Sequence, residues 1–343
     1  RVEVLRGPAS SLYGSDAIGG VVAMTTVKPG SLLDGDADAA ARFESGYASK
    51  DDGWHASLVG AARLGPAEAL LGYVRREGQA SGTAADVTPN PRDYGADSLL
   101  GRIVLPGAPG GPLTLTAEAG RIQQDTSVDA LLGTPPRFVN TTLLLGDDRS
   151  ERFRVDIGQQ LDRTAWFDSA DWRLYWQGTD TEQRSFERRR AVPPRTPPLQ
   201  IEREFRIEDR AYGLEFTAAR ALTAGQITHD LVYGLEAALT TLDQLRDGLQ
   251  VNRATGATST TILGENMPMR DFPLTDVTGI GIFAQDEVAV GHSAWTLIPA
   301  LRLDYYRLEP RADRVYREDN PAVPVVALDE LSFAPKLGVT YEI

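Results

Sequence analysis

The feature that most constrains this chain is a series of segments of about ten residues in which apolar and polar side chains alternate. In residues 230–241, one face carries the apolar side chains of Leu231, Tyr233, Leu235, Ala237 and Leu239. The opposite face carries Gly, Glu, Ala and Thr, and residues 333–343 repeat the pattern. A period of two residues is the period of a β-strand. The sequence therefore predicts an all-β chain from Ala39 onward.

The connections between these segments are expected to alternate between short and long. The expected short connections are 64–67, 106–112, 162–171, 221–226 and 290–293. The expected long connections are 78–97, 125–150, 182–205, 243–276 and 309–330. A soluble β-sandwich also has a polar face, but it does not sort its loops by length. A meander of about twelve strands, with tight turns at one end and long loops at the other, is typical of a transmembrane antiparallel β-barrel.

Aromatic side chains are expected to form two girdles where such a barrel leaves the membrane. Three tryptophans fall beside short connections, namely Trp166, Trp172 and Trp295. Four aromatic residues fall toward the long connections, namely Tyr47, Trp54, Tyr305 and Tyr306. The alternative is that these rings fill a protein core.

Composition excludes several other classes of protein. The net charge of −13 and the pI near 4.8 argue against a partner that is a nucleic acid, which requires an excess of Lys and Arg. The chain has no cysteine and only three histidines, so thiolate sites are impossible and zinc chemistry is disfavoured. No apolar run approaches the roughly 20 residues of a membrane-spanning helix.

The first thirty residues, RVEVLRGPASSLYGSDAIGGVVAMTTVKPG, differ from the rest of the chain. Two short apolar strands flank a region rich in turns, whose glycines permit close approach of the backbone. This region resembles the end of the plug domain of TonB-dependent outer-membrane receptors. The residues of the motif are Arg6, Gly7, Pro8, Ser11, Tyr13, Gly14, Asp16, Gly19 and Gly20.

The resemblance implies that residues 1–30 are the C-terminal end of a plug, that 31–38 are a linker and that 39–343 are the N-terminal half of the barrel. A receptor of this family has about twenty-two strands, so we expect a fragment with about twelve of them. Such a fragment is not expected to fold stably alone, because both end strands would lack partners. The resemblance also implies location in the cell outer membrane, contact with its lipid and a partnership with the TonB complex of the inner membrane.

In this family, arginines of the plug meet carboxylates of the barrel wall. The resemblance therefore makes Arg6 a candidate partner for Glu215, Glu236 or Glu287, which are expected at or near the inner face. The alternative is that Arg6 is simply solvated.

Several stretches are similar to the subgroup of receptors for haem and haemoglobin, namely 10–23, 88–94, 97–100, 271–273 and 283–287. The resemblance implies active import of haem or a haemoprotein, as cargo rather than as a resident cofactor, with a ferric siderophore as the alternative cargo. The histidine that this subgroup uses is expected beyond Ile343. Within the chain, His55 and Tyr94 are the weak candidates for ligand contact, and Met267 and Met269 are expected in exposed loops.

Two other classes of protein remain as alternatives. An outer-membrane barrel enzyme would need clustered Asp and His, or Ser and His, at one rim, and three histidines disfavour it. A soluble adhesion module would have loops of random length. The sequence therefore favours a transporter that is not an enzyme and that holds no metal.

Overall fold

The computed structural model describes residues 2–6, 19–33, 35–82, 89–194, 196–291 and 293–342. Near the N-terminus lie β1 (Val2–Arg6), β2 (Gly20–Met24) and the short 3-10 helix η1 (Pro29–Ser31). The long strands follow, namely β3 (Ala39–Ala48), β4 (Gly53–Leu64), β5 (Ala67–Gln79), β6 (Arg92–Leu105), β7 (Leu113–Ser127), β8 (Thr141–Leu161), β9 (Ser169–Arg189), β10 (Leu199–Ala224), β11 (Ile227–Asn252), β15 (Leu274–Val290), β16 (Trp295–Arg311) and β17 (Leu328–Tyr341). Small elements lie between them, namely η2 (Asp129–Leu131), β12 (Thr258–Ser259), β13 (Thr261–Ile262), β14 (Glu265–Asn266) and α2 (Arg314–Asp319).

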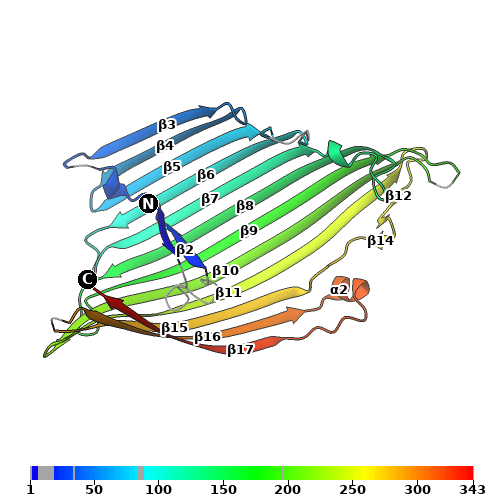
Figure 1. Cartoon of the computed structure of the whole chain (residues 1–343). Helices are drawn as coiled ribbons and strands as arrows, with labels where there is room; N and C mark the ends of the chain where they lie inside the picture. The colour runs from blue at the N-terminus through cyan, green and yellow to red at the C-terminus, as the bar shows by residue number, and fades with distance from the viewer. Residues whose placement is uncertain are drawn as a thin grey trace.

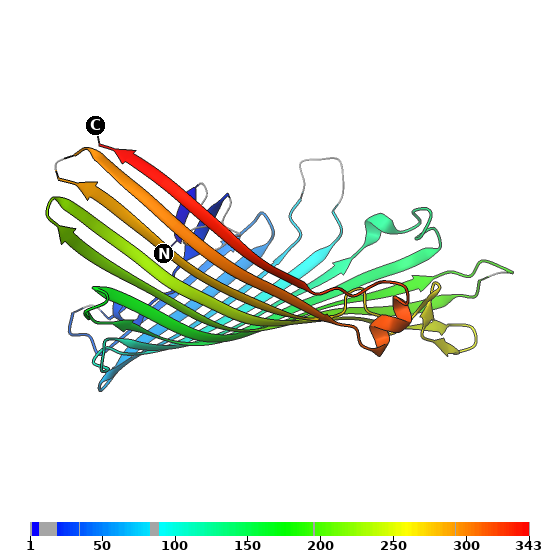
Figure 2. The ribbon, with the colours of Figure 1, turned by 90° about the horizontal axis from the view of Figure 1, so that it is seen from below.

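The long strands form one antiparallel meander in which each strand pairs with its neighbours in sequence. The sheet runs from β3 at one edge to β17 at the other, and β12 adds a short thirteenth strand beside β11. The strands curve into an open trough, and the β1–β2 hairpin lies inside the curve (Figures 1 and 2). This arrangement confirms the predicted all-β fold and the predicted meander of about twelve long strands.

One face of the sheet is covered by the N-terminal segment, and we call it the inner face. Leu33 packs there against Ala61 on β4 and Leu70 on β5. Nearby, the Arg102 guanidinium on β6 donates to the backbone oxygen of Val27 at 2.8 Å. Alternation along the strands then assigns every other residue to the opposite, outer face. Exposed apolar side chains line that face, among them Leu71, Ile103, Leu115, Ile157 and Leu174.

The connections differ in length at the two ends of the strands, as predicted. At one end the turns are tight, and residues 65–66 and 225–226 each join two strands with a glycine in the left-handed region. At the other end lie the longer connections 80–91, 128–140, 190–198, 253–273 and 312–327. The first connection at this end, 49–52, is short. Because transmembrane β-barrels of the outer membrane have their longer loops on the extracellular side, we call this end extracellular.

The strands extend further toward the extracellular end than the sequence suggested. A strand crosses the hydrocarbon of a bilayer in about 9–11 residues, whereas β10 and β11 each have 26. The expected long connection 182–205 is mostly strand, because cross-strand contacts pair its polar side chains. The buried carboxylate of Glu187 on β9, for example, accepts from Thr141 on β8 at 2.6 Å and from Arg203 on β10 at 3.3 Å.

The aromatic residues follow the predicted girdles with one exception. Trp166 and Trp295 are exposed beside short turns, and the Trp295 ring lies 4.7 Å from that of Tyr341. Tyr47 and Trp54 are exposed near the extracellular end. Tyr306 pairs with Gly279 and, by alternation, lies on the inner face, so its assignment to a girdle is wrong. No helix in the described part of the chain is both long and apolar enough to cross a membrane.

Candidate functional site

The inner face of the sheet is the candidate functional surface, because the N-terminal segment docks on it. The main attachment is Arg102, whose Nη1 and Nη2 donate to the Val27 oxygen at 2.8 Å and to Thr26 Oγ1 at 2.6 Å. Its Nε contacts Thr116 Oγ1 on β7 at 3.3 Å. One arginine therefore joins the segment directly after β2 to two neighbouring wall strands.

Charged side chains of the inner face form networks that join different strands of the sheet. On β8 to β10, Arg173 contacts Asp156 at 3.8 Å and Glu215 at 3.5 Å. On β11 and β16, Arg302 contacts Glu236 at 2.9 Å and Asp304 at 2.8 Å. These pairs balance charge on a surface that is largely polar, as in the lumen of a barrel.

Aromatic rings on the inner face lie flat over glycines of the adjacent strand. A Cβ on Gly213 would lie 2.1 Å from the Tyr175 ring, and a Cβ on Gly234 would lie 2.6 Å from the Phe283 ring. The same relationship joins His55 to Gly46 at 2.4 Å and Tyr94 to Gly78 at 2.6 Å. In each pair the two residues are direct register partners. The glycines let the rings lie along the wall instead of projecting into the lumen.

The predicted carboxylate partners of Arg6 lie in different settings. Glu215 and Glu236 face inward, and each contacts an arginine of the wall. Glu287 is exposed and lies opposite Asp230 in the register. Arg6 is exposed at the end of β1, and among the described residues no ion pair joins it to these three carboxylates. The pairing with the plug arginine stays a prediction.

The plug motif falls largely outside the described residues. Gly7, Pro8, Ser11, Tyr13, Gly14 and Asp16 all lie in the range 7–18. Gly19 and Gly20 are described, and Gly20 begins β2 opposite Arg6 with a φ of 145°. A Cβ there would lie 2.5 Å from the Leu5 oxygen, so this position of the motif requires glycine.

The two candidate ligand residues lie on the inner face near its extracellular end. His55 is on β4 and Tyr94 is on β6, separated by β5. The Tyr94 hydroxyl donates to Asp51 at 2.9 Å, and this hydrogen bond raises the pKa of Tyr94 above its ordinary value, with burial and the Asp51 charge adding to the shift. The described residues contain no group of three His, Asp or Glu side chains that could hold a metal ion.

A buried arginine in the extracellular region was not predicted from the sequence. Arg270, in the connection 253–273, ion-pairs with Asp243 on β11 and contacts Asp313 beside α2 at 3.1 Å. Asn320 donates to the Arg270 backbone oxygen at 2.9 Å. We call these residues the Arg270 clasp. Local sequence patterns carry no signal for it, because its members come from three separate segments.

The same extracellular connection corrects one expectation from the sequence. Met267 and Met269 are buried, and they pack with Leu199, Ile201 and Ile262 in a small apolar cluster. The Arg246 amide also donates to the Met269 oxygen at 2.9 Å, which holds the connection against β11. The expectation that the two methionines are exposed is therefore wrong, because the connection folds back over the ends of β10 and β11.

A meandering sheet with an apolar outer face, a polar inner face and an N-terminal segment on the inner face defines a plugged transmembrane β-barrel. Residues 38–343 match the family described as TonB dependent receptor-like, beta-barrel, and residues 1–21 match the TonB-dependent Receptor Plug Domain. The chain belongs to the TonB-dependent receptor family. Proteins of this family are receptors and transporters.

Solved structures share this fold at low sequence identity. The FrpB iron transporter of Neisseria meningitidis superposes with a TM-score of 0.66 and 15% identity, over 99% of this chain and 50% of that one. The siderophore receptor PiuA of Acinetobacter baumannii gives 0.59 and 16%, over 99% and 52%. The Serratia marcescens hemophore receptor HasR, in complex with HasA and heme, gives 0.59 and 14%, over 99% and 47%. The chain thus spans about half the length of these solved relatives.

A curated relative is similar over a shorter stretch. The hemin receptor of Yersinia pestis is 39% identical over 74 residues, which are 22% of this chain and 10% of that protein.

Proposed function

We propose that this chain is part of an outer-membrane receptor that imports haem or a haemoprotein by a TonB-dependent mechanism. The observation that carries the choice of cargo is the 39% identity with the Yersinia pestis hemin receptor over 74 residues. Because the chain spans about half the length of its solved relatives, we assign transport to a closed barrel in which further strands complete the wall.

In this proposal, cargo enters from the extracellular end and meets the inner face. His55 is the preferred candidate of the two, because imidazole is a common axial ligand of haem iron. To reach the iron, its ring would turn away from Gly46 toward the lumen. Tyr94 could bind iron only after its hydroxyl leaves Asp51. The inner-face ion pairs and the Arg102 attachment hold the wall and the linker in place until force from TonB displaces the plug.

A haem titration of the full-length receptor tests the choice of cargo. A Soret shift in the wild type that is reduced in His55→Ala supports haem import with His55 as a contact. His229→Ala is the matched control, because His229 is engaged with Asp286 at 2.7 Å on the outer face near a short turn. A shift of equal size in His55→Ala assigns binding to other residues, and no shift in the wild type contradicts haem as cargo.

A ferric siderophore is the second candidate cargo. Solved relatives that superpose over nearly the whole chain include the siderophore receptor PiuA and the pyoverdine-bound FpvA of P. aeruginosa. Growth of an iron-starved strain that depends on this receptor, supplied in turn with haem and with ferric siderophores, distinguishes the two. Growth on siderophore alone would replace haem in the proposal.

A further inference from the structure

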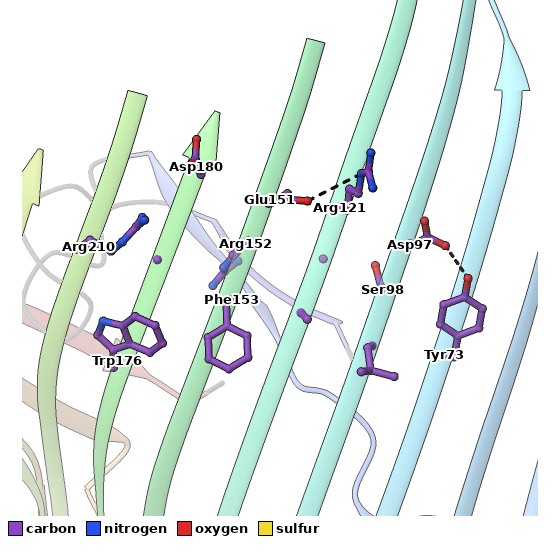
Figure 3. Close-up of a pocket in the computed structure, with 14 residues that line it drawn as sticks. Tyr73, Asp97, Ser98, Arg121, Glu151, Arg152, Phe153, Trp176, Asp180 and Arg210 are labelled. Atoms are coloured by element: carbon purple, nitrogen blue, oxygen red, sulfur yellow. Dashed lines mark hydrogen bonds and ion pairs between the residues drawn. The ribbon is translucent and has the colours of Figure 1, made fainter. Parts of the chain in front are cut away.

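A hollow of about 460 Å³ lies on the outer face of β5 to β10, the face opposite to the one that the N-terminal segment covers. Figure 3 shows the Phe153 and Trp176 rings beside it, with Arg121 and Arg210 on the same side of the sheet. The hollow cannot be part of the cargo path, because the wall separates it from the lumen.

The hollow exists because small residues occupy two positions of one row across the sheet. Direct register partners make up this row, in the order Tyr73, Leu99, Ala119, Phe153, Gly178 and Arg210. Ala119 and Gly178 leave space between larger neighbours. The Phe153 and Trp176 rings meet edge to face at 5.4 Å and form one wall of that space.

The row marks the boundary between apolar and charged parts of the outer face. The next row toward the short turns contains no charge and consists of Leu71, Gly101, Ala117, Val155, Trp176 and Tyr212. The next row toward the extracellular end is entirely charged and consists of Arg75, Asp97, Arg121, Glu151, Asp180 and Glu208. A transition of this kind places the hollow at the level of lipid headgroups.

The two arginines beside the hollow have weaker carboxylate contacts than their neighbours. Arg121 reaches Glu151 only at 3.9 Å, and Arg210 reaches Glu208 at 3.4 Å. The carboxylates of the charged row are held by other groups. The Tyr73 hydroxyl donates to Asp97 at 2.5 Å, Arg206 contacts Asp180 at 2.7 Å, and Arg149 pairs with Glu151. Arg121 also donates to Gln123 at 2.8 Å, and Arg210 donates to the backbone oxygens of Thr179 and Asp209 at 3.1 and 3.0 Å. Because a guanidinium has five N–H donors, each group keeps donors for an added anion.

We propose that this hollow binds the phosphorylated sugar headgroup of an outer-leaflet glycolipid. The phosphate would pair with Arg121 and Arg210, because guanidinium groups recognise phosphate through bidentate hydrogen bonds. The sugar ring would lie against Phe153 and Trp176, and its hydroxyls would donate to the rim carboxylates. The acyl chains would follow the uncharged row below. The proposal uses the outer-membrane location from the proposed function, but it does not depend on which cargo is carried.

A glycolipid fits better than a glycerophospholipid because the rim offers acceptors as well as cations. Asp97, Glu151 and Asp180 all line the hollow. A phosphate diester with few hydroxyls would bring negative charge close to these carboxylates and offer them no additional donors, whereas a sugar supplies several hydroxyl donors.

The test is a titration of the delipidated full-length receptor with diphosphoryl lipid A, followed by native mass spectrometry. We expect one tightly retained lipid A and at least tenfold weaker retention in the double variant Arg121→Ala, Arg210→Ala, since loss of two charge-assisted contacts amounts to at least about 1.4 kcal/mol. Arg307→Ala is the control, because Arg307 is also charged and extracellular but lies on β16, outside the hollow. Retention by this control is expected to equal that of the wild type.

A second variant tests the hollow without removing charge. Ala119→Phe fills the space, and it is expected to weaken lipid A retention while both arginines remain. Heat-dependent mobility on gels verifies that each variant is folded, and cargo binding by the same preparations separates this proposal from the proposed function. Unchanged lipid A retention in the double variant or in folded Ala119→Phe would overturn the proposal. Equally tight retention of phosphatidylglycerol that is equally sensitive to the double variant would also overturn it.

Discussion

The ring of Tyr175 on β9 covers the Cα of Gly213 on β10 so closely that a Cβ there would lie 2.1 Å from the ring. The two residues are direct partners in the register. The ring also lies under the Arg154 guanidinium, at 4.3 Å from its carbon. The absence of a side chain at residue 213 therefore determines the position of a ring and of a charge on the inner face.

Gly213→Ala is expected to lower the free energy of unfolding by about 1–3 kcal/mol, because the new methyl must displace the Tyr175 ring. Gly279→Ala on β15 is the matched control, since a Cβ there has no atom within 4 Å. Denaturant unfolding of the full-length receptor in detergent measures both. In a Tyr175→Ala background the cost of Gly213→Ala should nearly vanish, and equal effects of the two glycine variants would contradict the argument.

Arg102→Ala is expected to release the segment directly after β2, residues 25–28, from the wall, because it removes the hydrogen bonds to Thr26 and Val27. Amide hydrogen exchange of residues 25–28 should accelerate several-fold while the wall strands keep their protection. Arg152→Ala serves as the control, because Arg152, on β8, is also an arginine of the wall but contacts only Gln177, at 3.5 Å, among the described contacts. Unaltered exchange in Arg102→Ala would show that other contacts hold residues 25–28 on the wall.

Arg270→Ala is expected to loosen two extracellular connections together. The variant leaves the Gln244 backbone oxygen without a buried donor and leaves Asp243 and Asp313 without the cation that they share, at a cost of about 1–3 kcal/mol. Hydrogen exchange should rise both in 253–273 and in 312–327. Arg314→Ala is the control, because the Arg314–Glu318 pair is exposed. Faster exchange in only one connection would contradict the role of the Arg270 clasp.

The Tyr94–Asp51 hydrogen bond is expected to give alkaline pH dependence. It raises the pKa of Tyr94 in the folded state, so its contribution to stability is complete below the ordinary tyrosine pKa of about 10 and is lost as pH rises through the folded value. Difference absorbance of tyrosinate between the wild type and Tyr94→Phe reports this titration. Asp51→Ala should return the pKa of Tyr94 toward its ordinary value, and an unchanged titration would remove Asp51 as the cause.

Much of the wall was predictable from the sequence, because alternation is a local property. The strand pattern around Leu235 and Glu236 predicted which side chains share a face, and that assignment is confirmed for the inner-face pair of Glu236 with Arg302. The ends of the strands were not predictable. The polar run around Arg184 and Glu204 looked like a loop, but those side chains pair across β9 and β10 at 3.4 Å and keep the segment extended.

The candidate site was also predictable from the sequence only in part. The sequence indicated that His55 and Tyr94 approach the extracellular end, but it gave no sign that each ring covers a glycine of the adjacent strand. Predicting such a pair requires the register of the strands, because the register determines which glycine lies opposite which ring.

By itself, the sequence determined an antiparallel wall with one apolar and one polar face, and its first residues indicated the family. Both were predictable because alternation and the plug motif are local features of consecutive residues. Only the tertiary structure decided the Arg270 clasp, the glycine–ring pairs and the hollow beside Arg121. Each of these depends on partners on separate strands or loops, up to 50 residues apart for Arg270 and Asn320. Such contacts depend on register and on the folding-back of connections, which local patterns do not specify.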